Sequence, residues 1–143
     1  MLSSLHLKLS YRSGRDDQVK DFLNPCLENS VLYRRAAGYF TSKGLALAAR
    51  GVANLASRGG KMRLVVSPHL EADDVAALQN ALERPKEILT SIAARNLNEL
   101  QSQIEKDRLN ALAWLAASGL LEIRIALRVD ESGRIKRGLY HEK

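Results

Sequence analysis

The chain of 143 residues carries 22 Lys and Arg against 16 Asp and Glu, for a formal net charge of +6, and its length fits one domain with its own hydrophobic core. Its apolar stretches are short and broken by charged residues, which argues against a membrane-spanning helix and favours a cytoplasmic protein, while the single cysteine, Cys26, excludes an internal disulfide and a thiolate metal cage. The positive surplus favours a polyanionic partner, and nucleic acid fits better than a membrane because no segment joins a wide apolar face to a uniformly basic one.

Three segments are recognisable at the start of the chain. Residues 5–9 alternate apolar and polar side chains, which predicts a short strand or an extended lead-in. Residues 16–23 have helical spacing behind an acidic first turn, and Asn24-Pro25 is expected to close this amphipathic helix. Residues 31–40 contain β-branched and aromatic side chains and predict a strand that crosses into a loop.

The next two segments complete a βαβ pattern. Thr41 or Ser42 can cap a helix that runs to about residue 57. Gly44 and Gly51 weaken the helical propensity of that segment, so we expect close packing against a neighbouring element to compensate. Residues 61–67 hold a near-continuous apolar run, typical of a strand buried on both faces. Strand, helix and strand together predict a right-handed parallel unit, and therefore an α/β fold.

The middle of the chain is helical in pattern. Residues 71–82 predict a helix with acidic residues near its N-terminus, and Arg84-Pro85 predicts a break. Residues 86–107 then predict one long helix. Because the whole segment 71–107 is more polar than the two ends of the chain, we interpret it as a helical insertion that covers the sheet.

The last elements return to the sheet. A helix that begins near Leu109 is expected to close at Ser118-Gly119, and residues 121–127 alternate as in a strand with one exposed or site-facing side. The turn at residues 130–133 then predicts a final strand over 135–143 that runs back antiparallel to it. The expected fold is a single domain over residues 1–143, with a mixed, largely parallel sheet flanked by helices.

The end of the chain pairs an imidazole with an ammonium group. In an extended segment alternate residues share a face, so His141 and Lys143 would lie side by side while Glu142 points away. Such a pair suits phosphoryl chemistry, because histidine can attack phosphorus or relay a proton and lysine can neutralise phosphate oxygens. The alternative is a solvated polar tail.

Several segments together resemble one branch of the phospholipase D-like superfamily. His141-x-Lys143 matches the opening of the His-x-Lys-x4-Asp signature, and the runs Arg34 to Ser42, Gly59 to Pro68 and Leu112 to Leu115 resemble the corresponding parts of that branch in the same order. Its members are nuclease domains at the N-terminus of bacterial restriction-type helicases. The resemblance covers nearly all of the chain, and the motif aspartate would lie beyond Lys143.

The resemblance implies a mechanism and a context. Two such motifs face each other across a pseudo-twofold or dimer axis, and catalysis requires no metal or cofactor. His141 would be the nucleophile or the acid, and Lys143 would hold a phosphate oxygen. The second half of the active site would come from a homodimer, or from a second motif further along a longer parent protein. The chain would then be the N-terminal part of a DNA restriction or repair helicase of superfamily 2, a phospholipase D-like sandwich incomplete at its C-terminus and inactive alone.

Basic residues near these segments are candidates for nucleic-acid binding. Arg34 and Arg35 precede Tyr39 and Phe40, which could stack on bases or belong to the core. Four more candidates surround the last hairpin, namely Arg124, Arg134, Lys136 and Arg137. For this second group the alternative is a solvated charged face. A non-catalytic nucleic-acid-binding or interaction module of a helicase is therefore the competing hypothesis for the whole chain.

Overall fold

The computed structural model describes residues 1–136, and within them the chain forms an α/β fold around a three-stranded sheet. The strands β1 (Leu32–Ala37), β2 (Lys61–Val66) and β3 (Leu121–Ile125) lie in the order β1-β2-β3, and both pairings are parallel. This confirms the α/β class and the parallel βαβ unit. The helices are α1 (Asn24–Glu28), α2 (Ser42–Leu47), α3 (Ala49–Ser57), α4 (Ala72–Glu83), α5 (Pro85–Thr90), α6 (Leu97–Lys106) and α7 (Arg108–Ala117).

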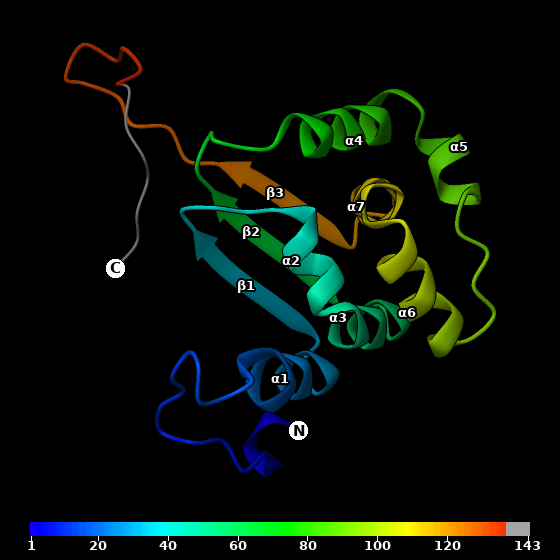
Figure 1. Cartoon of the computed structure of the whole chain (residues 1–143). Coiled ribbons are helices and arrows are strands. Elements are labelled where there is room, and N and C mark those ends of the chain that lie inside the picture. Colours follow the sequence, from blue (N-terminus) through cyan, green and yellow to red (C-terminus); the bar gives the residue numbers. More distant parts are fainter. Residues whose placement is uncertain (137–143) are drawn as a thin grey trace.

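The helices gather on one side of the sheet (Figure 1). In β2, Met62, Leu64 and Val66 are buried against this helical layer, whereas the alternate residues of the strand are exposed. Val65, on the opposite face, keeps 37% of its surface accessible. The prediction that residues 61–67 are buried on both faces is therefore wrong. Strand residues alternate between faces, and within residues 1–136 only one face of this sheet is covered.

Helix α7 lies at the centre of the helical layer. It packs against α2, α4, α5, α6 and β3, and its Leu112 and Leu115 are completely buried. Helices α4, α5 and α6 thus pack around α7 (Figure 1). They make up most of the segment 71–107, whose interpretation as an insertion stays a prediction.

The helix predicted from residue 42 to 57 is two helices, α2 and α3, which meet at Ala48. Thr41 is the N-cap, as predicted, and its Oγ1 accepts a hydrogen bond from the Gly44 N–H at 3.3 Å. The packing expected at the glycines holds for Gly51 only. A Cβ there would lie 2.9 Å from the Leu27 Cβ, whereas one at Gly44 would meet its nearest neighbour at 3.9 Å.

The single long helix predicted over residues 86–107 is also wrong, because the chain forms α5 and α6 with a loop between them. Asn96 caps α6 by accepting the Glu99 N–H at 3.0 Å, and the Glu99 carboxylate accepts the Arg95 N–H at 2.7 Å. The Asn96 side chain satisfies a backbone donor in the first turn of α6, and the Glu99 side chain binds the residue before the N-cap. This reciprocal capping starts a new helix.

Of the two alternatives predicted for residues 5–9, the strand is wrong, which leaves the extended lead-in. These residues form no strand, and the Leu9 side chain is fully exposed, because no described segment pairs with them. Asn24-Pro25 does not end a helix either. A π-helical turn at Val19–Leu23 runs directly into α1, and Pro25 lies in the first turn of α1.

Beyond β3 the chain makes the predicted turn. The Asp130 carboxylate accepts hydrogen bonds from the Ser132 hydroxyl at 2.6 Å and from the Arg134 N–H at 2.9 Å. These bonds hold the pKa of Asp130 below its ordinary value. The returning segment forms one antiparallel bridge, between Val129 and Ile135, and the rest of the predicted final strand lies outside the described residues. All three described strands are parallel, so within residues 1–136 the sheet is not mixed.

Candidate nucleic-acid interface

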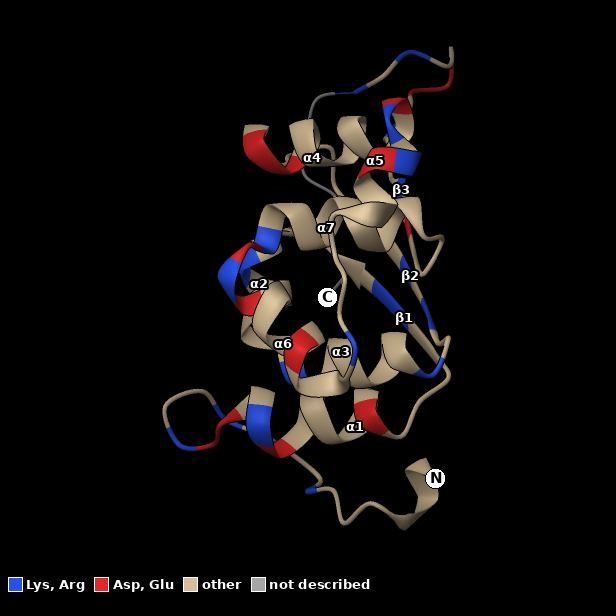
Figure 2. Cartoon of the chain, turned by 90° about the vertical axis from the view of Figure 1, so that its right-hand side faces the viewer, with Lys and Arg blue, Asp and Glu red and all other residues tan. Residues whose placement is uncertain are grey.

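The uncovered face of the sheet carries a band of basic side chains across all three strands. In the parallel register Arg34 pairs with Arg63, and Arg63 with Glu122. Residues paired in this way share a face, and so do residues two positions apart in one strand. The basic sheet face therefore comprises Arg34 from β1, Lys61 and Arg63 from β2, and Arg124 from β3, with Glu122 as its carboxylate. Lysine and arginine are visible along β1 and β2 in Figure 2.

One carboxylate is shared between two of these cations. Arg124 contacts Glu122 Oε1 at 2.6 Å, and Arg63 Nε lies 3.3 Å from Glu122 Oε2. All three side chains are more than a third exposed, so these ion pairs add little stability. Glu122 orders the two guanidinium groups and neutralises only one of the two charges.

The remaining two cations leave the face strongly positive. Lys61 Nζ donates to the Gly119 carbonyl at 3.0 Å, which orients the ammonium group without neutralising it. Arg34 has no side-chain hydrogen bond or ion pair among residues 1–136. Strands of a parallel sheet lie about 4.8 Å apart, so the four cations form a compact patch that a polyanion can contact at several points.

The structure separates two neighbouring candidates. Arg34 and Arg35 are adjacent in sequence, but Arg35 pairs with Leu64, which faces the helices. Arg35 thus belongs to the opposite side of the sheet. Of the predicted binding residues, Arg34 and Arg124 share the basic sheet face, whereas Arg134 and Lys136 are exposed in the hairpin beyond β3.

Sequence reasoning missed two members of this face, Lys61 and Arg63. Both lie in β2, which was interpreted as buried on both faces. The signal was present in the run Lys61-Met62-Arg63-Leu64, where basic and apolar residues alternate with the period of a half-exposed strand.

The predicted catalytic pair, His141 and Lys143, lies outside the described residues, and so does Arg137. Their catalytic and binding roles stay predictions. Within residues 1–136 no group of three or more His, Cys, Asp or Glu could hold a metal ion. In the same range, no helix is long and apolar enough to cross a membrane.

The carboxyl edge of the sheet holds a buried carboxylate that the sequence did not single out. Asp74 is completely buried, and its Oδ2 accepts the backbone N–H of Ser42 at 2.9 Å. This bond ties the start of α4 to the start of α2. His69, a residue near the end of β2, is exposed, and its backbone N–H lies 3.4 Å from Ser67 Oγ. No local pattern reveals the Asp74 contact, because its partner is 32 residues away.

Over residues 1–136 these features define an α/β protein with a three-stranded parallel sheet, one helix-covered face and one exposed basic face. No family model, curated protein or solved structure matched the chain in the three comparisons that were made.

Proposed function

We propose that this chain is the DNA-binding N-terminal part of a phospholipase D-like nuclease attached to a restriction or repair helicase in the cytoplasm. The observation that carries the proposal is the basic sheet face, where Arg34, Lys61, Arg63 and Arg124 outnumber the one carboxylate found there among residues 1–136. Positive side chains held on a rigid sheet suit the regularly spaced phosphates of DNA. The resemblance of the His141-x-Lys143 segment to the superfamily signature supports the nuclease assignment.

In the proposed reaction, His141 attacks a phosphodiester phosphorus, and the bond from phosphorus to the leaving oxygen breaks. Lys143 neutralises a non-bridging oxygen as charge develops on it. A second histidine, from another copy of the chain or from a later segment of the parent protein, protonates the leaving alcohol. Water then releases the phosphate from the histidine, and the basic sheet face binds the DNA backbone by charge alone.

The competing proposal is a nucleic-acid-binding module without catalysis. It is favoured by the fact that every basic residue on the sheet face can bind phosphate without any contribution from His141. The two proposals share the binding surface and differ only in the chemistry at the end of the chain.

The deciding experiment is cleavage of labelled single- and double-stranded DNA in excess chelator by a protein extended beyond Lys143. Metal-independent cleavage is the expected result. If DNA is bound in a salt-sensitive manner and not cut, the binding module is correct and the nuclease proposal fails.

The DNA-binding role of the sheet face predicts the effect of Arg34→Gln. This change removes a cation without breaking an ion pair, so the fold should be unaffected. We expect weaker DNA binding, and a log-log plot of affinity against salt that is shallower by about one unit. Fluorescence anisotropy over a salt series measures both.

The matched control is Lys86→Gln, which removes one exposed positive charge from α5. Its salt dependence should equal that of the unmodified protein. An Arg34→Gln variant that also keeps the original slope would show that DNA does not contact this face.

A further inference from the structure

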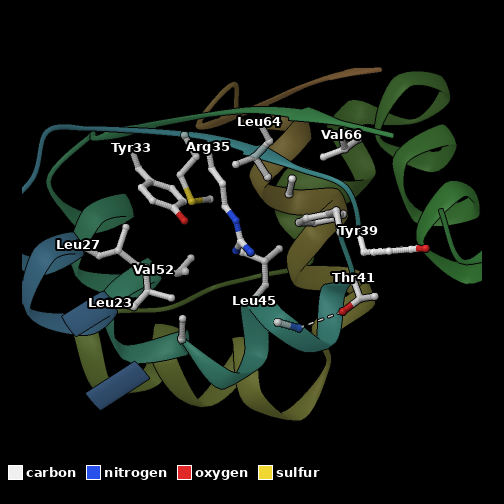
Figure 3. Close-up of a pocket in the computed structure, with 15 residues that line it drawn as sticks. Leu23, Leu27, Tyr33, Arg35, Tyr39, Thr41, Leu45, Val52, Leu64 and Val66 are labelled. Carbon is white, nitrogen blue, oxygen red and sulfur yellow. Dashed lines mark hydrogen bonds between the residues drawn. The ribbon is translucent and has the colours of Figure 1, made fainter. Parts of the chain in front are cut away.

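A pocket opens on the helix-covered side of the sheet, opposite the basic sheet face. It lies between β1 and β2 on one side and helices α1, α2 and α3 on the other, with a cavity volume of about 180 Å³. Figure 3 shows Leu27, Leu45, Val52 and Leu64 among the apolar side chains around it. Most of the lining is hydrocarbon, and the pocket is open to solvent, so a ligand can enter.

Among the residues that the structure describes, one charged side chain lines this apolar pocket, that of Arg35. Its side chain extends from β1 between the surrounding apolar groups (Figure 3). Among residues 1–136 it has no hydrogen bond or ion pair. A guanidinium group carries five donors and stays charged at any physiological pH. The pocket therefore presents an unneutralised cation beside an apolar surface.

A second polar group is available in the pocket. Tyr33 precedes Arg35 by two positions in β1, so both side chains lie on the same face of the sheet. Figure 3 shows the two side chains next to each other. The Tyr33 hydroxyl has no hydrogen-bond partner among residues 1–136. A fork of guanidinium donors with a phenolic hydroxyl beside it is a recognition site for a planar oxyanion.

The size and charge of the pocket limit the class of ligand that it can bind. Typical ligand pockets have volumes of about 300–1,000 Å³, whereas an apolar cavity of about 150 Å³ holds one benzene ring. A volume of about 180 Å³ thus suits a single ring with a small polar substituent. One guanidinium neutralises one negative charge, which favours a monoanionic carboxylate over a phosphate dianion. From these observations we propose that the pocket binds a small aromatic carboxylate, with the ring among Leu27, Leu45 and Val52 and the carboxylate on Arg35.

Benzoate is the probe, and benzamide is its neutral counterpart of the same shape. Titration of the whole chain at constant ionic strength, followed by NMR of the pocket methyl groups, should give saturable binding of benzoate at millimolar concentrations. Benzamide should bind about 10-fold more weakly or not at all, because it lacks the charge that strengthens the hydrogen bonds to arginine. Equal binding of the two, stronger binding of inorganic phosphate, or no response to benzoate would overturn the proposal.

Variants assign the binding to the proposed residue. Arg35→Gln should weaken benzoate binding about 10-fold or more, and Arg35→Lys should weaken it less, since lysine keeps the charge and loses the fork. Lys86→Gln, on α5, should bind benzoate as the unmodified chain does. Unfolding curves establish that each variant is folded. Unchanged affinity in folded Arg35→Gln would show that benzoate binds elsewhere.

Discussion

Replacing His141 with alanine is expected to abolish DNA cleavage by a protein extended beyond Lys143 while leaving DNA affinity intact. If His141 is the general acid, its loss should reduce cleavage by about 10²–10⁴-fold, and by more if it is the nucleophile. Binding should persist because the substitution leaves every charge of the basic sheet face, including Arg34 and Arg63, in place. Single-turnover cleavage with enzyme in excess separates the chemical step from binding.

The control for this experiment is His6→Ala, which removes the same side chain from an exposed position in the N-terminal segment. It should cleave at the unmodified rate. Lys143→Ala should slow cleavage as His141→Ala does, since it removes the charge beside the scissile phosphate. A His141→Ala variant that cleaves at the original rate would contradict the catalytic assignment and leave the sheet face as a binding surface only.

Replacing Gly51 with alanine is expected to destabilise the protein by about 1–3 kcal/mol, the usual cost of overpacking a core. The new Cβ would lie 2.8 Å from Asn24 Oδ1 and 2.9 Å from Leu27 Cβ. Neither atom is the end of a long flexible side chain, so α1 itself would have to move. That movement would also weaken the 3.1 Å hydrogen bond from the Gly51 N–H to Asn24, which satisfies a backbone donor in the first turn of α3.

Gly44→Ala is the matched comparison for Gly51→Ala, because it makes the same change in the neighbouring helix α2. Its added Cβ would meet only Thr41 Oγ1, at an ordinary contact distance of 3.9 Å. Alanine is the better helix former by about 1 kcal/mol, so Gly44→Ala should stabilise or be neutral. Urea unfolding curves of the two variants measure both effects. Stabilisation by both changes would show that α1 and α3 are not closely packed.

The class of fold and most of its strands could be predicted because each depends on local pattern. The strands near residues 31–40, 61–67 and 121–127 and the parallel βαβ unit were predicted and are present. The errors arose where a local signal was overlooked or incomplete. Asn96 and Glu99 start a new helix that periodicity alone could not reveal. Residues 5–9 alternate like a strand, yet a strand also needs a partner.

The candidate site could be predicted only in part from local sequence pattern. Arg34 was predicted from its charge beside the Tyr39-Phe40 segment and Arg124 from its charge near the last hairpin, and both lie on the basic sheet face. The sequence prediction misses Lys61 and Arg63 because the apolar run next to them is typical of a strand buried on both faces. The contact between Asp74 and Ser42 had no local signal at all.

Residue order alone was enough to set the periodicity of the strands and the turn at Asp130, since each depends on neighbours within a few positions. The positive surplus follows from composition alone. Only the folded chain decided which face of the sheet is covered. That choice depends on the register of three strands and on the packing of α7, both made by residues far apart in sequence. As a result Arg34 faces solvent among other cations, whereas Arg35, one residue later, lines an apolar pocket.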